Sequence, residues 1–507
     1  MVDMRESELK RGCDVGTSPP TGRILLILCA AIVLPVGLWK LSDDVINPPI
    51  LVAALVMYSI IVLSVMTVLS HRRVTLLDPL LYIACTYYIP ACIGAVNLGF
   101  TRKQPLYEPL LPQYEHSMVI AFVYFALGYV SLWIGFRLCK AKNARRIARR
   151  MPHWNWTPQS VILPALILLA VGDFFRFEAF SSGVIGYTNT TTEYGETLFS
   201  VAGLGTIGAF YLCWSIFSAR RKTAIHLALA LIVLAHSMYF VLTSGGKGAP
   251  ITLVILIMLA YYASGLHLGP RGVFIAAAIA AVAIIGGVAY GSGFRQLLGG
   301  EREATLTEYI DTAQGTVTQL GNMDVQDTLQ TTLRLFLSRC DRTSALAVLI
   351  ARHDELKGAE ANYGINDNIL RDTATSIIPR FIWKDKPTVA DGRILTQLYI
   401  NVYDTTNTFG FVGDLFRNAG AVGVVIGMAL LGSVLKLGYT TLVTNSESIW
   451  ARSTYCILLT SSFNFEGLYS GILPALIHSA LICVVAGVFT EFVVGRRRRN
   501  YASSTMK

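Results

Sequence analysis

Long apolar stretches recur along nearly the whole chain, and they constrain its fold more than any other feature. A stretch of about 17–25 apolar residues can cross a bilayer as a helix. Lipid offers no partner to backbone polar groups, so such a stretch must be helical. Hydrophobic residues make up 53% of the 507 residues, and charged residues make up 15%. We therefore predict an all-α polytopic membrane protein with about twelve transmembrane helices. The expected spans are 23–39, 49–70, 77–98, 117–138, 161–175, 198–218, 224–243, 250–266, 273–291, 421–442, 453–465 and 472–494.

Basic residues cluster between these spans, and their placement predicts the orientation. The basic runs at 71–73, 137–150, 220–222 and 496–499 all fall on one side when helical crossings separate them. Cytoplasmic loops of membrane proteins carry this excess of Lys and Arg. We expect both termini in the cytoplasm. The net charge of +10 then reflects topology and contact with the lipid bilayer, and no nucleic-acid partner is expected.

One long polar segment, 293–408, interrupts the apolar sequence and is expected on the outer face. It is too long for a simple connector. Apolar residues recur in it at helical spacing, and Asp341 or Thr343 is placed to cap one of its helices. We expect a compact cap of short amphipathic helices. The predicted layout is a cytoplasmic tail (1–22), nine spans (23–292), the large external loop domain (293–408), three spans (409–495) and a basic cytoplasmic tail (496–507).

Several cations lie where the expected spans meet the outer face. Lys247 sits in Ser-Gly-Gly-Lys-Gly (244–248), whose glycines let backbone N–H groups approach an anion closely. Arginine suits phosphate because its fork binds bidentately. Each cation alone is more simply a solvated surface charge, but the set indicates an anionic ligand. Its members are Lys247, Arg295, Arg339, Arg342, Arg380, Lys384, Lys386 and Arg417.

Asp414 and Arg417 are spaced i, i+3 and can pair on one helix face. Charges near the membrane boundary are costly unless they are used. Two interpretations stay open. The pair is either structural, or Arg417 faces a substrate while Asp414 orients it or accepts a proton. Asp173 and Arg176 carry the same ambiguity at another outer boundary.

Metal and cofactor signatures are missing from the sequence. No zinc spacing, P-loop or nucleophile elbow occurs, so we expect no metal and no cofactor. His226, His236 and His478 fall on apolar stretches, which favours packing over ligation. Lipid-linked glycosyl transfer can proceed without a metal when cations hold the diphosphate leaving group and a base activates the acceptor hydroxyl.

Three motifs in the second half of the chain resemble the O-antigen polymerase (Wzy-type) family. They are the turn Ile-Pro-Arg-Phe-Ile-Trp-Lys-Asp-Lys-Pro (378–387), the Ser-Gly-Gly-Lys-Gly at the end of a span, and Gly-Asp-Leu-Phe-Arg-Asn-Ala-Gly (413–420). In that family the last segment usually reads Gly-Glu-x-Tyr-x-Asn-x-Gly. Here Asp414 replaces the glutamate and Phe416 the tyrosine. Some members carry an Arg-x10-Gly pattern in two outer loops, which these loops lack, so the resemblance leaves the catalytic base unassigned.

The resemblance implies an inverting GT-C-like glycosyltransferase in the bacterial inner membrane. Such an enzyme joins undecaprenyl-diphosphate-linked oligosaccharides into a surface polysaccharide, with a chain-length regulator and a flippase as possible partners. By matched position, Arg380 and Lys247 would hold the diphosphate and Asp414 would lie near the reaction centre. An O-antigen ligase is the nearest alternative, for which His353 is the candidate loop histidine. A flippase or other lipid-linked sugar transporter is the alternative from another class. It predicts ionisable residues at mid-membrane, whereas those of this sequence gather at the outer boundaries, which favours surface chemistry over translocation. The candidate catalytic residues are Asp414, Arg417 and Arg380, and the candidate substrate-binding residues are Lys247, Arg295, Arg339, Arg342, Trp383, Lys384 and Lys386.

Overall fold

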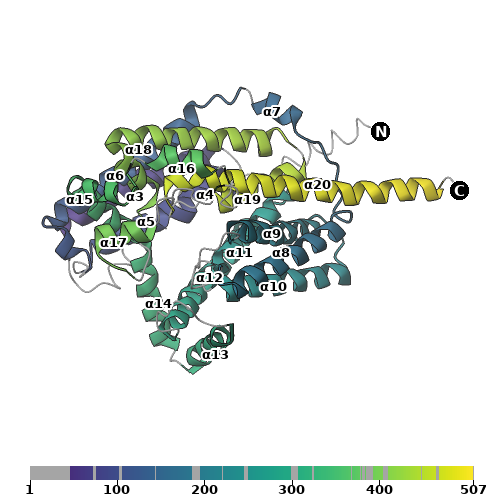
Figure 1. Ribbon diagram of the computed structural model, residues 1–507, viewed down its shortest axis with the longest axis horizontal. Coiled ribbons are helices and arrows are strands. Elements are labelled where there is room, and N and C mark those ends of the chain that lie inside the picture. Colours follow the sequence, from purple (N-terminus) through teal and green to yellow (C-terminus); the bar gives the residue numbers. More distant parts are fainter. Residues whose placement is uncertain are drawn as a thin grey trace.

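Every secondary-structure element in the described part of the chain is a helix (Figure 1). This computed structural model describes residues 46–71, 76–101, 106–142, 144–184, 195–219, 221–244, 249–297, 306–322, 325–366, 368–376, 378, 383, 392–403, 409–446, 448–463 and 467–505. The predicted all-α class is confirmed within these ranges.

The helices follow one another with short connections along most of the chain. Those of the first half are α3 (Pro48–His71), α4 (Pro79–Ile83), η1 (Ala84–Tyr88), α5 (Ile89–Leu98), η2 (Glu108–Leu110), α6 (Tyr114–Leu138), α7 (Ala144–Arg150), α8 (Ile162–Ser181), α9 (Gly195–Ser218) and α10 (Ala224–Ser244). Those of the second half are α11 (Ala249–Ala263), α12 (Pro270–Leu297), α13 (Leu306–Asn322), α14 (Val325–Cys340), α15 (Thr343–Asn362), α16 (Asn368–Ser376), α17 (Gly392–Ile400), α18 (Gly410–Tyr439), η3 (Thr440–Thr444), α19 (Ile449–Ser461), η4 (Tyr469–Gly471) and α20 (Ile472–Thr505).

Eight stretches within the described residues are long and apolar enough to cross a membrane. They match eight of the expected spans and show a membrane-embedded protein. They are Pro48–Thr67, Pro79–Leu98, Tyr114–Leu138, Thr197–Ser218, Ala224–Thr243, Arg271–Phe294, Gly410–Thr444 and Tyr469–Arg496. Three other expected spans form shorter or more polar helices. Of these, α11 has 15 residues and α19 has 13, while α8 carries Asp173, Arg176 and Glu178. The first expected span, 23–39, lies outside the described residues.

Two helix pairs pack with their backbones in close contact, and glycine makes this possible. A Cβ atom added to Gly135 of α6 would lie 1.9 Å from the carbonyl oxygen of Ala429 in α18. Similarly, a Cβ atom on Gly172 of α8 would lie 2.0 Å from the backbone nitrogen of Gly205 in α9. Small residues allow this approach between helices in lipid, where association depends on packing rather than on the hydrophobic effect. The α6–α18 and α8–α9 pairs are therefore the rigid supports of the fold.

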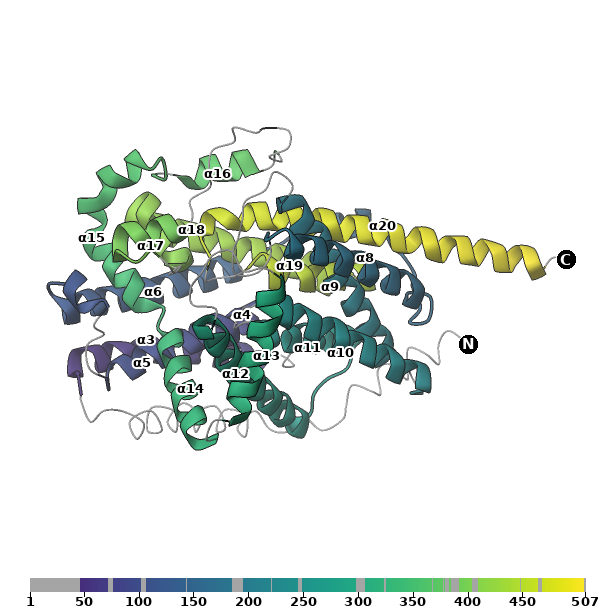
Figure 2. The ribbon, with the colours of Figure 1, turned by 60° about the horizontal axis from the view of Figure 1, so that its bottom comes forward.

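The polar segment between α12 and α18 does form short helices, but they are divided between two supports. Helices α13 and α14 pack on α12, and α14 also packs on α5. Helices α15 and α17 pack on each other, α15 reaches α6 and α18, and α16 packs on η4. The two groups lie on different sides of the molecule in both views (Figures 1 and 2). The segment is thus not one compact cap, because each group follows a different pair of supporting helices.

The predicted capping of this segment is confirmed at α15. The Asp341 carboxylate accepts hydrogen bonds from the backbone nitrogens of Thr343 and Ser344, both at 3.0 Å. These are two of the first amides of the helix, which lack partners within the helix itself. Near the C-terminal end of α15 lies Glu360, which is 1% exposed and faces α18.

Candidate functional site

Helix α18 begins with a short segment that folds back on the rest of the helix. The break lies at Ala419 and Gly420, and Gly420 has φ 59° and ψ −152°. This conformation is essentially restricted to glycine. Beyond the break, a Cβ atom on Gly423 would lie 2.6 Å from the Leu415 carbonyl oxygen, and one on Gly427 would lie 2.3 Å from the Leu415 side chain. The glycines thus let the segment 410–418 lie against the first turns of the span that follows.

The folded-back segment carries Asp414 and Arg417, which pair as their spacing predicts. The Arg417 Nη2 atom lies 2.7 Å from Asp414 Oδ1, and both side chains are 0% exposed. The backbone nitrogen of Ser470 in η4 donates to the other carboxylate oxygen, Oδ2, at 3.0 Å. Asn418 donates from Nδ2 to the Asp414 carbonyl oxygen at 2.8 Å. Both oxygens of Asp414 are therefore engaged within the protein.

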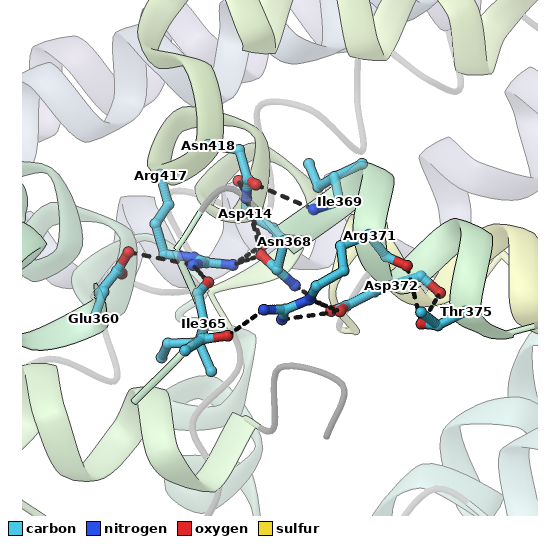
Figure 3. A network of polar contacts seen from close by, with 11 residues as sticks. Glu360, Ile365, Asn368, Ile369, Arg371, Asp372, Thr375, Asp414, Arg417 and Asn418 are labelled. Atoms are coloured by element: carbon cyan, nitrogen blue, oxygen red, sulfur yellow. Dashed lines mark hydrogen bonds and ion pairs between the residues drawn. The ribbon is translucent and has the colours of Figure 1, made fainter. Parts of the chain in front are cut away.

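Residues from the polar segment complete the surroundings of Arg417 (Figure 3). Its Nη1 atom donates to the Ile365 carbonyl oxygen at 2.5 Å and lies 3.3 Å from Glu360 Oε2. Its Nη2 atom also donates to the side-chain oxygen of Asn368, the first residue of α16. The Tyr399 hydroxyl of α17 donates to the other oxygen of Glu360 at 2.8 Å. One guanidinium thus joins α15, α16 and α18, and α17 is added through Glu360.

Helix α16 turns its polar face toward this cluster. Asn368 donates to Asp372, and the Arg371 guanidinium lies 3.1 Å from the other Asp372 oxygen. The Ile369 backbone nitrogen donates to Asn418 Oδ1 at 3.2 Å. On the opposite face, Leu370 is 81% exposed. Polar contacts therefore hold most of this helix to the protein, with Ile369 packed against the apolar core.

A buried ion cluster of this kind holds elements together when its members are mutually satisfied. Burial and the neighbouring Glu360 carboxylate raise the pKa of Tyr399, so its hydroxyl remains a donor at neutral pH. The Arg417 Nε atom is the one atom of its guanidinium that has no partner within the described residues. In this arrangement Arg417 is not placed to grip a diphosphate directly. It acts as the joint between α18 and the helices of the polar segment.

The other predicted site residues are distributed unevenly. Arg339 is exposed at the end of α14, Arg342 is half-buried just before α15, and Trp383 is exposed. Arg295 lies on the last turn of α12, but its side chain is outside the described part of the protein. Lys247, Arg380, Lys384 and Lys386 lie outside the described residues altogether. The structure therefore joins Asp414 to Arg417 and leaves the predicted convergence of the other cations as a prediction.

His353 lies two turns before Glu360 on the same face of α15 and contacts the folded-back segment. Its ring meets the Phe416 ring edge-on, with centroids 5.7 Å apart. Phe416 in turn contacts Tyr124 of α6 at 4.9 Å. The His353 Nδ1 atom is buried and has no partner within the described residues. The loop histidine is therefore close to the cluster without being part of its hydrogen bonding.

A second polar cluster lies among α8, α9 and α10. The sequence indicated two of its members, Asp173 and Arg176, but not their neighbour His236. The His236 Nδ1 atom lies 2.7 Å from Asp173 Oδ1. His236 is buried, as expected for a packed histidine, but it is paired with a carboxylate 63 residues away. The prediction for Asp173 and Arg176 named no partner because helical spacing along α8 gives no information about α10. Within the described residues, no group of three or more His, Cys, Asp and Glu side chains could hold a metal ion.

Comparison with known proteins gives one match. A family model described as a domain of unknown function, DUF8712, matches residues 176–473, which is more than half of the chain. No curated protein and no solved structure matches the chain. The matched range contains every residue of the Arg417 cluster, and it begins three residues after Asp173.

Proposed function

The chain belongs to the DUF8712 family, and we propose that it is a polymerase of lipid-linked oligosaccharides. In this proposal it is a GT-C-like, inverting and metal-independent glycosyltransferase of the bacterial inner membrane. It joins undecaprenyl-diphosphate-linked repeat units into a surface polysaccharide at the outer face. The proposal rests on the motifs at 244–248, 378–387 and 413–420 together with the geometry of the third motif.

The observation that carries the proposal is the position of Arg417 within that third motif. Arg417 holds Asn368 at the start of α16 and, through it, Asp372. Helix α16 ends at Ser376, and the basic turn 378–387 follows directly. A contact that fixes α16 also fixes the point at which this turn begins. In this proposal the motif at 413–420 positions the motif at 378–387, in which Arg380 holds the diphosphate.

The two ends of α18 support the proposed sidedness. The Arg417 cluster lies at the start of α18, and the basic helix α7 packs on η3 at its other end (Figure 1). The stretch 421–444 between them is apolar and helical, and its 24 residues span roughly 36 Å. That length crosses the hydrocarbon layer of a bilayer. Since basic segments favour the cytoplasm, the cluster and the polar segment belong on the outer side, and both termini belong in the cytoplasm.

The test is the fate of lipid-linked repeat units in the source bacterium. A strain without the gene should accumulate single lipid-linked units in the outer leaflet and lose long surface polysaccharide. The full chain should restore long polysaccharide, and Arg380→Ala should not. Arg393→Ala, which changes an exposed arginine of α17, is the matched control and should restore it. Long polysaccharide that persists without the gene would refute the proposal.

The ligase alternative has one observation in its favour, the unpartnered Nδ1 atom of His353. A ligase transfers the finished glycan to a different lipid acceptor, so its loss leaves long chains on undecaprenyl diphosphate. His353→Gln in the restored strain separates the two activities. Long lipid-linked chains that fail to reach the surface in this variant would favour the ligase, whereas short single units would favour the polymerase.

The transporter alternative is favoured by the Asp173–His236 pair, because ionisable groups inside spanning helices often mark translocation paths. A flippase acts before polymerisation, and its loss leaves repeat units in the inner leaflet. Units in the deletion strain that an externally added glycosidase cannot reach would therefore indicate a transporter. Units that it does reach would support the polymerase.

A further inference from the structure

The Asp173–His236 pair has the geometry of a proton-accepting dyad. The imidazole Nδ1 atom and the carboxylate Oδ1 atom are 2.7 Å apart. The His236 side chain is 6% exposed, whereas the Asp173 side chain is 25% exposed. The buried imidazole thus holds one carboxylate oxygen, and the carboxylate remains partly accessible. A base that is fixed in position and still reachable fits general base catalysis.

A cation and two hydroxyl groups lie on the outer side of the pair. Arg176, one turn along α8, is buried over the Phe240 ring at 3.8 Å, and its Nε atom donates to the Thr243 hydroxyl at 3.3 Å. The Tyr239 hydroxyl is close enough to interact with the charges of Asp173 and Arg176. These groups, with His236, are the charged and titratable ones that face Asp173 from α8 and α10. Charges buried among apolar helices are expensive, and this cost points to a functional role.

Helix α9 presents a glycine to the dyad. A Cβ atom on Gly205 would lie 3.1 Å from His236 Cε1 and 3.4 Å from Asp173 Oδ1. A side chain there would crowd His236 and touch Asp173. Two residues away, a Cβ atom on Gly203 would meet nothing within 4 Å. A substitution at Gly205 would therefore disturb the dyad, whereas the same substitution at Gly203 would not.

The dyad lies below the ends of α8 and α10 that the proposed orientation places on the outer side. Asp173 and His236 each lie eight residues before the last residue of their helices, Ser181 and Ser244, a distance of about 12 Å. Lys247 follows the end of α10 directly. Helix α13 covers the same end, because the Tyr309 hydroxyl donates to the Leu242 carbonyl oxygen at 2.6 Å.

We propose that Asp173, oriented by His236, is the catalytic base of the glycosyl transfer, an inference that rests on the proposed polymerase function. The acceptor sugar hydroxyl gives its proton to the Asp173 carboxylate. Its oxygen forms a bond to the anomeric carbon of the donor repeat unit. The bond between that carbon and the diphosphate oxygen breaks, and the undecaprenyl diphosphate leaves with the electron pair. The proton then passes from Asp173 to water.

The experiment uses the purified full chain in liposomes with the total lipid extract of the deletion strain. This extract supplies both donor and acceptor, whatever sugars the repeat unit contains. Product length is read from gels over time. Asp173→Asn keeps an oxygen for His236 but cannot accept a proton, so the rate should fall by about a hundredfold or more. For Asp173→Ala, added formate should raise the rate of the variant at least about tenfold, because a small carboxylate can replace a missing base.

Two matched controls separate a catalytic loss from a structural one. Asp78→Ala removes a buried carboxylate that caps α4 by accepting from the Leu80 nitrogen at 3.0 Å, and formate should not restore any rate that it loses. Gly205→Ala should slow transfer while Gly203→Ala leaves the rate near that of the wild type. Unfolding temperatures in detergent are measured for every variant.

Each result decides between the two proposals. If the wild type converts the extract and Asp173→Asn keeps more than about a tenth of the rate, the base assignment is wrong and the polymerase stands. A loss in Asp173→Ala that formate does not recover, at an unchanged unfolding temperature, also overturns the assignment. If the wild type does not convert the extract at all, the polymerase proposal fails and the assignment fails with it.

Discussion

Replacing Arg417 by methionine removes the guanidinium that contacts both Asp414 and Glu360. Their side chains are 0% and 1% exposed, so neither can recover its lost partner from water. Breaking a buried ion pair by removing one partner costs about 3–5 kcal/mol, because the remaining charge stays buried. The cluster also includes Asp372 and Arg371, and hence three carboxylates and two guanidinium groups. Arg417→Met therefore increases an existing excess of negative charge, which places the cost at the upper end of this range.

The matched change is Glu360→Gln. It removes the one excess negative charge and keeps the shape of the side chain. The amide oxygen can still accept from Arg417, and the amide nitrogen can donate to the Tyr399 hydroxyl, which accepts in place of donating. We expect it to change stability by less than about 1 kcal/mol, since the amide costs little to bury when it is hydrogen-bonded. Adding Asp414→Asn and Glu360→Gln to Arg417→Met should recover most of the lost stability. The effects of substitutions on stability are not additive when the residues are in contact.

The assay is thermal unfolding of the purified variants in one detergent, followed by tryptophan fluorescence. Arg417→Met should lower the unfolding temperature by on the order of 10 °C, from its expected cost and the usual sensitivity of domains to destabilisation. Glu360→Gln should lie within a few degrees of the wild type, a shift of roughly 1 kcal/mol or less. If Arg417→Met and Glu360→Gln shift the temperature equally, the cluster does not have the charge balance described, and its role as a joint is refuted.

Two further changes test local parts of the same joint. Gly420→Ala forces a side chain into a backbone conformation essentially restricted to glycine and should cost about 1–3 kcal/mol. Gly438→Ala, in the helical part of α18 with open space around it, should be neutral or stabilising in the same unfolding assay. Tyr399→Phe leaves a buried Glu360 oxygen without its donor and should cost about 1–3 kcal/mol at pH 7. Because burial raises the pKa of Tyr399 above its ordinary value of 10.0, the folded state keeps a proton that the unfolded state loses, so the difference between wild type and Tyr399→Phe should shrink as the pH rises above 10.

Local features of the sequence predicted local features of the structure. Apolar periodicity in the polar segment predicted helices where α14 and α17 are found, and the capping role of Asp341 followed from its place before α15. The i, i+3 spacing of Asp414 and Arg417 predicted their contact. In each case the interacting groups lie within one helix or at its end, where geometry is fixed by the helical repeat.

The partners that come from other helices could not be predicted in the same way. Glu360 and Ser470 lie 57 and 56 residues from the groups they contact, and His236 lies 63 residues from Asp173. A carboxylate on a polar amphipathic helix has the same local pattern whether it faces water or a buried guanidinium. The choice between the structural and the functional interpretation of Arg417 therefore had to wait for the packing of α15 and α16 against α18.

The two polar clusters differ in a way that assigns them different tasks. In the Arg417 cluster both Asp414 oxygens are occupied and the side chain is 0% exposed, so a proton acceptor there would have to break the joint before it could act. In the Asp173 cluster one oxygen is held by His236 and a quarter of the side chain is exposed. A catalytic base must be both oriented and reachable. Asp173 meets both conditions, whereas Asp414 is oriented but not reachable. If the chain is the proposed polymerase, the motif at 413–420 therefore supplies rigidity, and the proposed base is a carboxylate that lies outside it.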